Sequence, residues 1–366
     1  MTQAHWPEWL PLRPSLAPLS PYGAPQVEAD ASLNTNENPF PLSPSLVAAI
    51  SEKVGEVAAS LNRYPDRDAT ALRTALAQYI NAQSATNFQE GNIWATNGSN
   101  EIIQSLFLAF GEGSALGFIP SYSMHPLIAR VTATAWIDGA RRDDFSLDIE
   151  SAVEQVLRER PSLTFITTPN NPTGEAIPLS SIEKLAAVTP GLLVIDEAYA
   201  EFSDIESAVT LIEKFPHLVV IRTMSKAFSF AGARVGYLVA HPAVIDAMKL
   251  VRLPYHLSSL TQSAALVALE FQDELLSGVA QLRQQREIVA QGLRELGLDV
   301  LPSQANFLLF TGFSTPSADL WQAMLDRGIL IRDVGLSGYL RTTIGTGAEN
   351  EKFLDALREC LAKERL

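Results

Sequence analysis

The sequence predicts an α/β protein with a large domain, in which helices sandwich a mainly parallel central sheet, and a smaller α+β domain. The chain of 366 residues exceeds the size at which one hydrophobic core usually stops growing, so two domains are expected. Short apolar runs alternate with amphipathic stretches through the middle of the chain, and this alternation is typical of βαβ units. Beyond residue 296 the pattern changes to strands followed by a closing helix.

Six prolines within the first 26 residues predict an extended arm, because proline removes backbone donors and fixes φ. The arm also carries Trp6, Trp9 and several leucines, so we expect it to lie against another surface, its own or a partner subunit's. It lacks the basic stretch and apolar run of a secretory signal. No apolar run approaches the roughly 20 residues that a bilayer span needs, so the sequence indicates a cytoplasmic protein without a membrane partner.

The later elements are predicted in chain order from their apolar patterns. Strands of the large sheet are expected at 93–96, 115–119, 134–137, 163–167, 192–195 and 219–223. Helices are expected at 70–82, 101–110, 180–188, 243–250, 260–271 and 278–296. Strands at 306–310, 329–332 and 339–344 and a helix at 349–361 complete the chain. We therefore predict an arm with part of the small domain at 1–45, the large domain at 46–259 and the small C-terminal domain at 260–366.

The composition argues against several classes of protein. With 27 basic and 41 acidic residues the net charge is −14, whereas nucleic-acid binding rests on basic surface. The single cysteine, Cys360, excludes a disulfide framework. The five histidines are scattered without the spacing of metal ligands, so no metal site is expected.

A carboxylate ends one of the predicted strands. Asp196 closes the run LLVID, and ligands of open parallel sheets bind at the carboxyl ends of the strands. Taken alone, this residue reads equally well as a simple cap of the strand end. A nucleotide-hydrolase role, with Asp196 and Glu197 on Mg²⁺, would need a phosphate loop containing Gly-Lys, and the chain has no such pair.

One lysine stands apart from the others. Lys226 lies 30 residues after Asp196, behind another apolar strand, and its sequence neighbours are uncharged. The other six lysines lie in helix-like segments, most of them with a carboxylate nearby. A desolvated, neutral amine suited to Schiff-base chemistry is therefore expected at Lys226. Thr223, Ser225 and Arg234 flank it with donors that suit a phosphate group.

Two turns also follow predicted strands. The string TTPNNPTGEAIP at 167–178 would alone be read as a plain turn, because Asn, Pro and Gly dominate turns for backbone reasons. The string ATNGSNEII at 95–103 leads through Gly98 into a helix start, whose N–H groups form an anion site. Alone it is a weak phosphate signal, since every capped helix looks similar. Because both turns lie at the ends of predicted strands, a role in ligand binding is favoured over that of a plain turn.

Taken together and in this order, these strings resemble the class I and II aminotransferases of pyridoxal phosphate (PLP) fold type I. Within that family the resemblance is to the histidinol-phosphate aminotransferase branch, and it looks greatest for actinobacterial members. It runs from NTNENPFP at 34–41 through NRYPD at 62–66, PSYSMH at 120–125 and the strings above to YLRTTIG at 339–345. The resemblance thus covers nearly the whole chain, and the combination is specific although each string is not.

The resemblance implies a PLP cofactor held as an aldimine on Lys226, with pyridoxamine phosphate as the half-reaction form. Lys226 would move the substrate proton as general base and acid, while Asp196 would keep the ring nitrogen protonated. The other implied contacts are Tyr199 and Asn171 at the phenolic oxygen, Tyr122 on the ring face, Ser99, Asn100, Thr223, Ser225 and Arg234 at the phosphate, and Tyr64 from the neighbouring subunit of a homodimer.

The resemblance also implies where the substrates bind. The family's carboxylate-binding position falls on Arg341, which would take the phosphate of histidinol phosphate or a carboxylate of 2-oxoglutarate. Arg332 is a second candidate for the anion, although a strand-end surface arginine is a close alternative. Tyr22 and Tyr255 are candidates for the imidazole pocket, with Tyr255 reading about equally well as a core aromatic. Asn36 completes the substrate set.

The implied reaction is transamination of L-histidinol phosphate with 2-oxoglutarate, giving imidazole-acetol phosphate and glutamate, in histidine biosynthesis. An aromatic amino-acid aminotransferase of the same fold would keep every cofactor residue and differ only in the pocket. A PLP lyase, such as a phospho-amino-acid decarboxylase, would have a similar cofactor cradle. A ligand sensor fused to a DNA-binding module is disfavoured, because only a proline-rich arm precedes the fold and the net charge is acidic.

Overall fold

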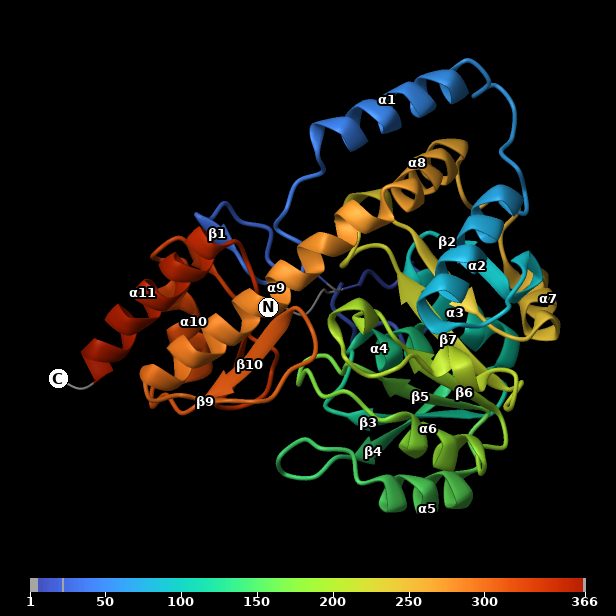
Figure 1. Cartoon of the computed structure of the whole chain (residues 1–366). Helices are drawn as coiled ribbons and strands as arrows, with labels where there is room; N and C mark the ends of the chain where they lie inside the picture. Colours follow the sequence, from blue (N-terminus) through green and yellow to red (C-terminus); the bar gives the residue numbers. More distant parts are fainter. Residues whose placement is uncertain (1–5, 22, 365–366) are drawn as a thin grey trace.

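A seven-stranded sheet forms the centre of the protein, whose computed structural model describes residues 6–21 and 23–364 (Figure 1). Among the described strands of this sheet, one runs antiparallel to its neighbours and the others are parallel. The predicted α/β class with a mainly parallel sheet is therefore confirmed. In spatial order the strands are β2 (Ile93–Thr96), the antiparallel β8 (Gly236–Val239), β7 (Leu218–Thr223), β6 (Leu192–Asp196), β5 (Leu163–Thr167), β3 (Ser114–Ile119) and β4 (Ala135–Ala140).

Helices cover both faces of the sheet because its strands are apolar on both sides. Successive residues of β5, Phe165 and Ile166, belong to the cores of opposite faces, as the alternation along a strand requires. One face packs against α3 (Ser99–Phe110), α4 (Met124–Val131) and α7 (Pro242–Val251). The other packs against α2 (Thr70–Ser84), α5 (Ile149–Glu159), α6 (Leu179–Ala186) and α8 (Ser259–Glu270).

A smaller group of elements lies at the other end of the long helix α9 (Gln272–Glu295), drawn in orange and red in Figure 1. It contains an antiparallel sheet of β9 (Asp299–Val300), β10 (Phe307–Thr311) and β12 (Leu340–Thr343), with α10 (Ser317–Leu325) and α11 (Gly347–Glu364). The early strand β1 (Ala31–Ser32) pairs in parallel with β11 (Ile329–Leu330), while α1 (Pro44–Ala58) lies along α8. The boundaries at 45 and 259 stay a prediction.

The predicted strands and helices are present with shifted ends, but several elements were not predicted. The strand β8 is four residues long and buried throughout, so it has no alternation by which to recognise it. The strands β1 and β9 have two residues each, too few for a period. The strand predicted at 329–332 ends at Leu330, and Arg332 instead forms an isolated bridge with Arg341.

The proline-rich arm contains turns, and neither helix nor strand occurs within residues 6–21. It lies against the large sheet's helical layer, because Arg13 Nη2 donates to the carbonyl of Val131, 2.5 Å away at the end of α4. Trp6 Nε1 donates to the Ala17 carbonyl at 3.1 Å and folds the arm on itself. Tyr22, predicted to contact substrate, lies outside the described residues. None of the described helices has the length and apolarity to cross a membrane.

Candidate active site

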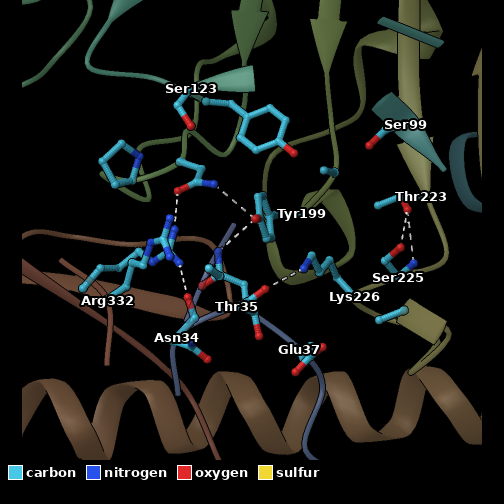
Figure 2. A pocket seen from close by; sticks show the side chains of 18 of the residues that line it. Asn34, Thr35, Glu37, Ser99, Ser123, Tyr199, Thr223, Ser225, Lys226 and Arg332 are labelled. Carbon is cyan, nitrogen blue, oxygen red and sulfur yellow. Dashed lines mark hydrogen bonds between the residues drawn. The ribbon is translucent and has the colours of Figure 1, made fainter. Parts of the chain in front are cut away.

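A cavity of about 410 Å³ opens at the carboxyl ends of β2, β3, β5, β6 and β7, where the strands of an open α/β sheet leave room for a ligand (Figure 2). Its remaining wall comes from residues 34–37 and from the arginines of the C-terminal group. The predicted site residues that line it are Asn36, Ser99, Asn100, Tyr122, Asn171, Asp196, Tyr199, Thr223, Ser225, Lys226, Arg234, Arg332 and Arg341. Strands far apart in the sequence thus deliver these side chains to one place.

Lys226 points into this cavity from the loop after β7 (Figure 2). Its Nζ donates to the carbonyl oxygen of Thr35 at 2.9 Å. The pKa of Lys226 is lowered from 10.5 to about 8, chiefly by burial and then by the positive charge of Arg341, whereas Glu37 opposes the shift. The lysine therefore has an appreciable neutral fraction near neutral pH, as a nucleophilic amine requires.

This lowered pKa predicts how Lys226 reacts as pH changes. Below a pKa of about 8 the amine is protonated and unreactive, and above it the amine is neutral. We expect the rate at which cofactor-free protein attaches PLP to rise through a midpoint near pH 8. Stopped-flow absorbance across pH 6–10 measures it, with N-α-acetyl-lysine as the comparison. A midpoint at the ordinary lysine value of 10.5 would contradict the assignment.

Asp196 lies at the end of β6 with its side chain buried. Its Oδ1 accepts from the N–H of Ala198 at 3.3 Å, and its Oδ2 lies 3.1 Å from Nε2 of His125. The His125 ring is itself fixed, since it packs 4.7 Å from Phe165 and edge-on to Tyr122. No role for His125 was predicted from the sequence. Its available signal was its position three residues after Tyr122, a spacing that places both on one side of a helical turn.

A chain of hydrogen bonds joins Tyr199 to Arg341. The Tyr199 hydroxyl accepts from Asn36 Nδ2 at 2.9 Å and from Asn171 Nδ2 at 3.5 Å. Asn171 Oδ1 in turn accepts from Arg341 Nη1 at 2.6 Å, while Arg341 Nη2 donates to the Asn34 carbonyl at 2.8 Å. The guanidinium of Arg341 is thereby held at a fixed place in the cavity wall, and Arg332, which pairs with Arg341 in an isolated bridge, lines the same cavity.

The opposite end of the cavity is a cradle of hydrogen-bond donors. The helix α3 begins at Ser99, so its first N–H groups face this end, and Thr223, Ser225 and Arg234 stand beside it (Figure 2 labels the first two). Gly98 has a φ of +82°, and a Cβ there would lie 2.5 Å from Arg234 Nη2. A Cβ on Gly236 would lie 2.6 Å from the Ser99 nitrogen. Glycines thus keep the guanidinium close to the helix start, and the donor set fits a phosphate group.

Two predicted residues lie outside this cavity. Tyr64 and Tyr255 stack on each other with ring centroids 4.4 Å apart, and they are 79% and 40% exposed. His256, read from the sequence as structural, lies with Nε2 2.9 Å from the Ala95 carbonyl. Among the other residues that line the cavity, and for which no role was predicted, are Ala24, Asn34, Thr35, Glu37, Ser121, Ser123 and Asp333. Most of them have short polar side chains that are common in turns, so their sequence pattern carries no signal.

The pyridoxal phosphate that the resemblance implies fits these residues, because one cavity presents an amine of lowered pKa, a buried carboxylate and a phosphate cradle. Among the described residues there is no cluster of three or more histidine, cysteine or acidic side chains that would hold a metal ion. The fold and the site together define the class of PLP-dependent transferases, in which a lysine holds the cofactor and the cofactor carries the amino group.

Comparisons with known proteins agree with this class. The family model for aminotransferase class I and II matches residues 30–357. The histidinol-phosphate aminotransferase from Mycobacterium sp. (strain KMS) is 55% identical to this chain, and the match covers 95% of this chain and 93% of the relative. The histidinol-phosphate aminotransferase from Corynebacterium glutamicum (strain R) is 54% identical, and the match covers 96% of this chain and 97% of the relative. The crystal structure of histidinol-phosphate aminotransferase from Sinorhizobium meliloti in complex with pyridoxal-5'-phosphate has a TM-score of 0.84 and 25% identity, covering 97% of this chain and 98% of that one. The chain therefore belongs to the class I and II aminotransferases, and within them to the histidinol-phosphate aminotransferases.

Proposed function

We propose that this enzyme uses PLP to transfer the amino group of L-histidinol phosphate to 2-oxoglutarate, giving imidazole-acetol phosphate and glutamate. The names of its relatives support the substrate, and the place in histidine biosynthesis and in the cytoplasm follows from the same resemblance. The observation that carries the proposal is the position of Arg341 and Arg332 in the wall of the cavity that holds Lys226. A phosphate and a carboxylate both suit the planar fork of an arginine.

The cofactor would be held at several of its groups by residues of this chain. Lys226 would attach to its carbonyl carbon, and Asp196, oriented by His125, would pair with its ring nitrogen. Tyr199 and Asn171 would contact its phenolic oxygen, and Tyr122 its ring face. The cradle of Ser99, Asn100, Thr223, Ser225 and Arg234 would bind its phosphate. When bound, PLP supplies a ring that accepts electrons from the substrate carbon.

The protein groups have distinct tasks in this scheme. The amine of Lys226 would act as the general base that takes a proton from the substrate carbon and as the general acid that returns one. The carboxylate of Asp196 would stabilise a positive charge on the ring nitrogen of the cofactor, and its burial would make that interaction strong. Arg341 binds the anionic end of each substrate in turn. Asn171 links the two ends of the site, since it contacts both Tyr199 and Arg341.

We also propose that the enzyme is a homodimer with shared active sites. The stacked rings of Tyr64 and Tyr255 lie on the surface, and Leu253 beside them is 75% exposed and Leu250 86% exposed. A group of large apolar side chains at the surface is typical of an interface. In the proposed dimer Tyr64 reaches the cofactor phosphate of the partner subunit, and Tyr255 contributes to the partner's substrate pocket.

The substrate proposal is tested by steady-state kinetics with purified holoenzyme. We expect kcat/KM for L-histidinol phosphate, with 2-oxoglutarate as acceptor, to exceed that for L-phenylalanine by at least about 100-fold, because L-phenylalanine offers the arginines a singly charged carboxylate instead of a phosphate and its ring has no polar group to pair. Glutamate should form in a one-to-one ratio with consumed donor and without CO₂, whereas a decarboxylase would release CO₂. A higher kcat/KM for phenylalanine would instead indicate an aromatic amino-acid aminotransferase.

A further inference from the structure

Residues 34–37 form the wall of the cavity beside Lys226, and the segment 34–38 that contains them is anchored at almost every position (Figure 2). The Asn34 carbonyl accepts from Arg341 and its side chain donates to the Pro25 carbonyl at 2.9 Å. The Thr35 carbonyl accepts from Lys226. The remaining anchors are Asn36, bonded to Tyr199, Thr343 and Asn306, and Asn38, bonded to Ala227 and Phe40. The backbone at Glu37 is therefore fixed from both sides.

The side chain of Glu37 is the exception in this segment. It lines the cavity and is exposed, and within the described part of the chain its carboxylate has neither a hydrogen bond nor an ion pair. The other acidic residues of the cavity are engaged, since Asp196 faces His125 and Asp333 accepts from the N–H of Gly335 at 2.8 Å. Glu37 nevertheless acts on the reaction centre, because its negative charge counters the lowering of the Lys226 pKa.

The carboxylate of Glu37 is therefore available to a ligand that donates a hydrogen bond or carries a positive charge. In L-histidinol phosphate the amine-bearing carbon joins a phosphate arm to an imidazole arm. When the amine is at Lys226 and the phosphate at Arg341, the imidazole must point elsewhere in the cavity. Figure 2 shows Glu37 on the wall below Lys226, away from Arg332. An imidazole offers an N–H donor and, with an unperturbed pKa near 6.5, readily becomes a cation beside a carboxylate.

We propose that Glu37 determines the specificity for the amino donor by accepting a hydrogen bond from its imidazole ring. This inference rests on the proposed function, since it assigns a residue to the ring of the proposed substrate. The acceptor 2-oxoglutarate has no such donor, and its two carboxylates are repelled by Glu37. The charge of Glu37 therefore favours one half-reaction and disfavours the other, which a residue with a merely structural role would not do.

The test compares the two half-reactions of the holoenzyme in single-turnover stopped-flow experiments. In Glu37→Gln, we expect the apparent second-order rate constant for L-histidinol phosphate to fall about tenfold, because a charge-assisted hydrogen bond becomes a neutral one. The rate constant of the amino form of the enzyme with 2-oxoglutarate should be unchanged or higher. Glu37→Asp, which keeps the charge, should recover part of the loss. The control is Glu52→Gln, which removes the same charge from an exposed position on α1.

Binding gives a second readout. Calorimetric titration of the Lys226→Ala protein loaded with PLP should show the same tenfold loss of affinity for L-histidinol phosphate when Glu37→Gln is added. Equal slowing of both half-reactions, or an unchanged donor half-reaction, overturns the inference. If the wild-type enzyme does not use L-histidinol phosphate, the proposed function fails. L-histidine, which carries the same ring, then tests Glu37 separately against L-phenylalanine, and an equal effect on both amino acids overturns the inference.

Discussion

Replacing Lys226 by alanine is expected to abolish transamination, with kcat falling by at least about 10⁴-fold. The variant loses the amine that attaches the cofactor and also the group that moves the substrate proton. Among the described residues that line the cavity, no second lysine is available to replace it. Steady-state assays measure the loss, and absorbance spectra should show that the band due to covalent attachment of PLP disappears.

The fold should tolerate this substitution, because Lys226 has one hydrogen bond, to Thr35, and its burial disfavours the charged form. Circular dichroism and thermal melting of the variant should therefore resemble those of the wild type. Lys184→Ala is the matched control, since Lys184 is exposed and forms a surface ion pair with Glu150. Near-normal turnover by Lys226→Ala would refute the assignment of the catalytic lysine.

The Asp196→Asn substitution is expected to lower kcat on the order of 10³-fold, the loss seen when one preorganised electrostatic group is removed from a buried site. Asparagine has nearly the same shape but cannot stabilise a positive charge on the ring nitrogen. The effect should be large because the side chain is only 3% exposed, so water screens the interaction little. Single-turnover rates with the amino donor measure the chemical step directly.

A companion variant separates the charge of Asp196 from its orientation. His125→Phe keeps the aromatic packing against Phe165 and removes the 3.1 Å contact to Asp196. We expect it to slow the same step by about tenfold, a smaller loss than Asp196→Asn causes, because the carboxylate remains but one hydrogen bond is lost. Asp273→Asn, at an exposed position on α9, should have no effect. Equal rates in Asp196→Asn and the wild type would show that Asp196 does not act on the cofactor.

The large sheet could be predicted from the sequence because its parallel strands are short, apolar and separated by amphipathic helices. Lys226 and Asp196 were recognisable for the same reason, since each follows such a strand and ligands bind at that edge. The pairing of β1 with β11 could not be predicted, because it joins two-residue strands that lie almost 300 residues apart. Local periodicity contains no information on such a contact.

The polar side of the cavity was harder to predict than its catalytic core. Asn36, predicted to bind substrate, lines the cavity and also bonds to Tyr199, Thr343 and Asn306, so it supports the cavity wall, and its contact with substrate stays a prediction. The sequence offers for His125 only its spacing from Tyr122, and its contact with Asp196 depends on how α4 lies against the sheet. The role of a polar residue depends on contacts that form only in the tertiary structure. The burial of apolar residues, in contrast, can be predicted from their spacing in the sequence.

The bond between Arg341 and the Asn34 carbonyl joins residues 307 positions apart, and the Lys226–Thr35 bond spans 191. Contacts of such sequence separation form late, because the intervening chain must be ordered first. During synthesis on the ribosome, the 34–38 segment cannot form its hydrogen bond with Arg341 until β12 has been synthesised. Lys226 and Asp196 are therefore synthesised before the strand that fixes this wall of the cavity. A nascent chain can acquire the elements that bind the cofactor before it has the means to discriminate between amino donors.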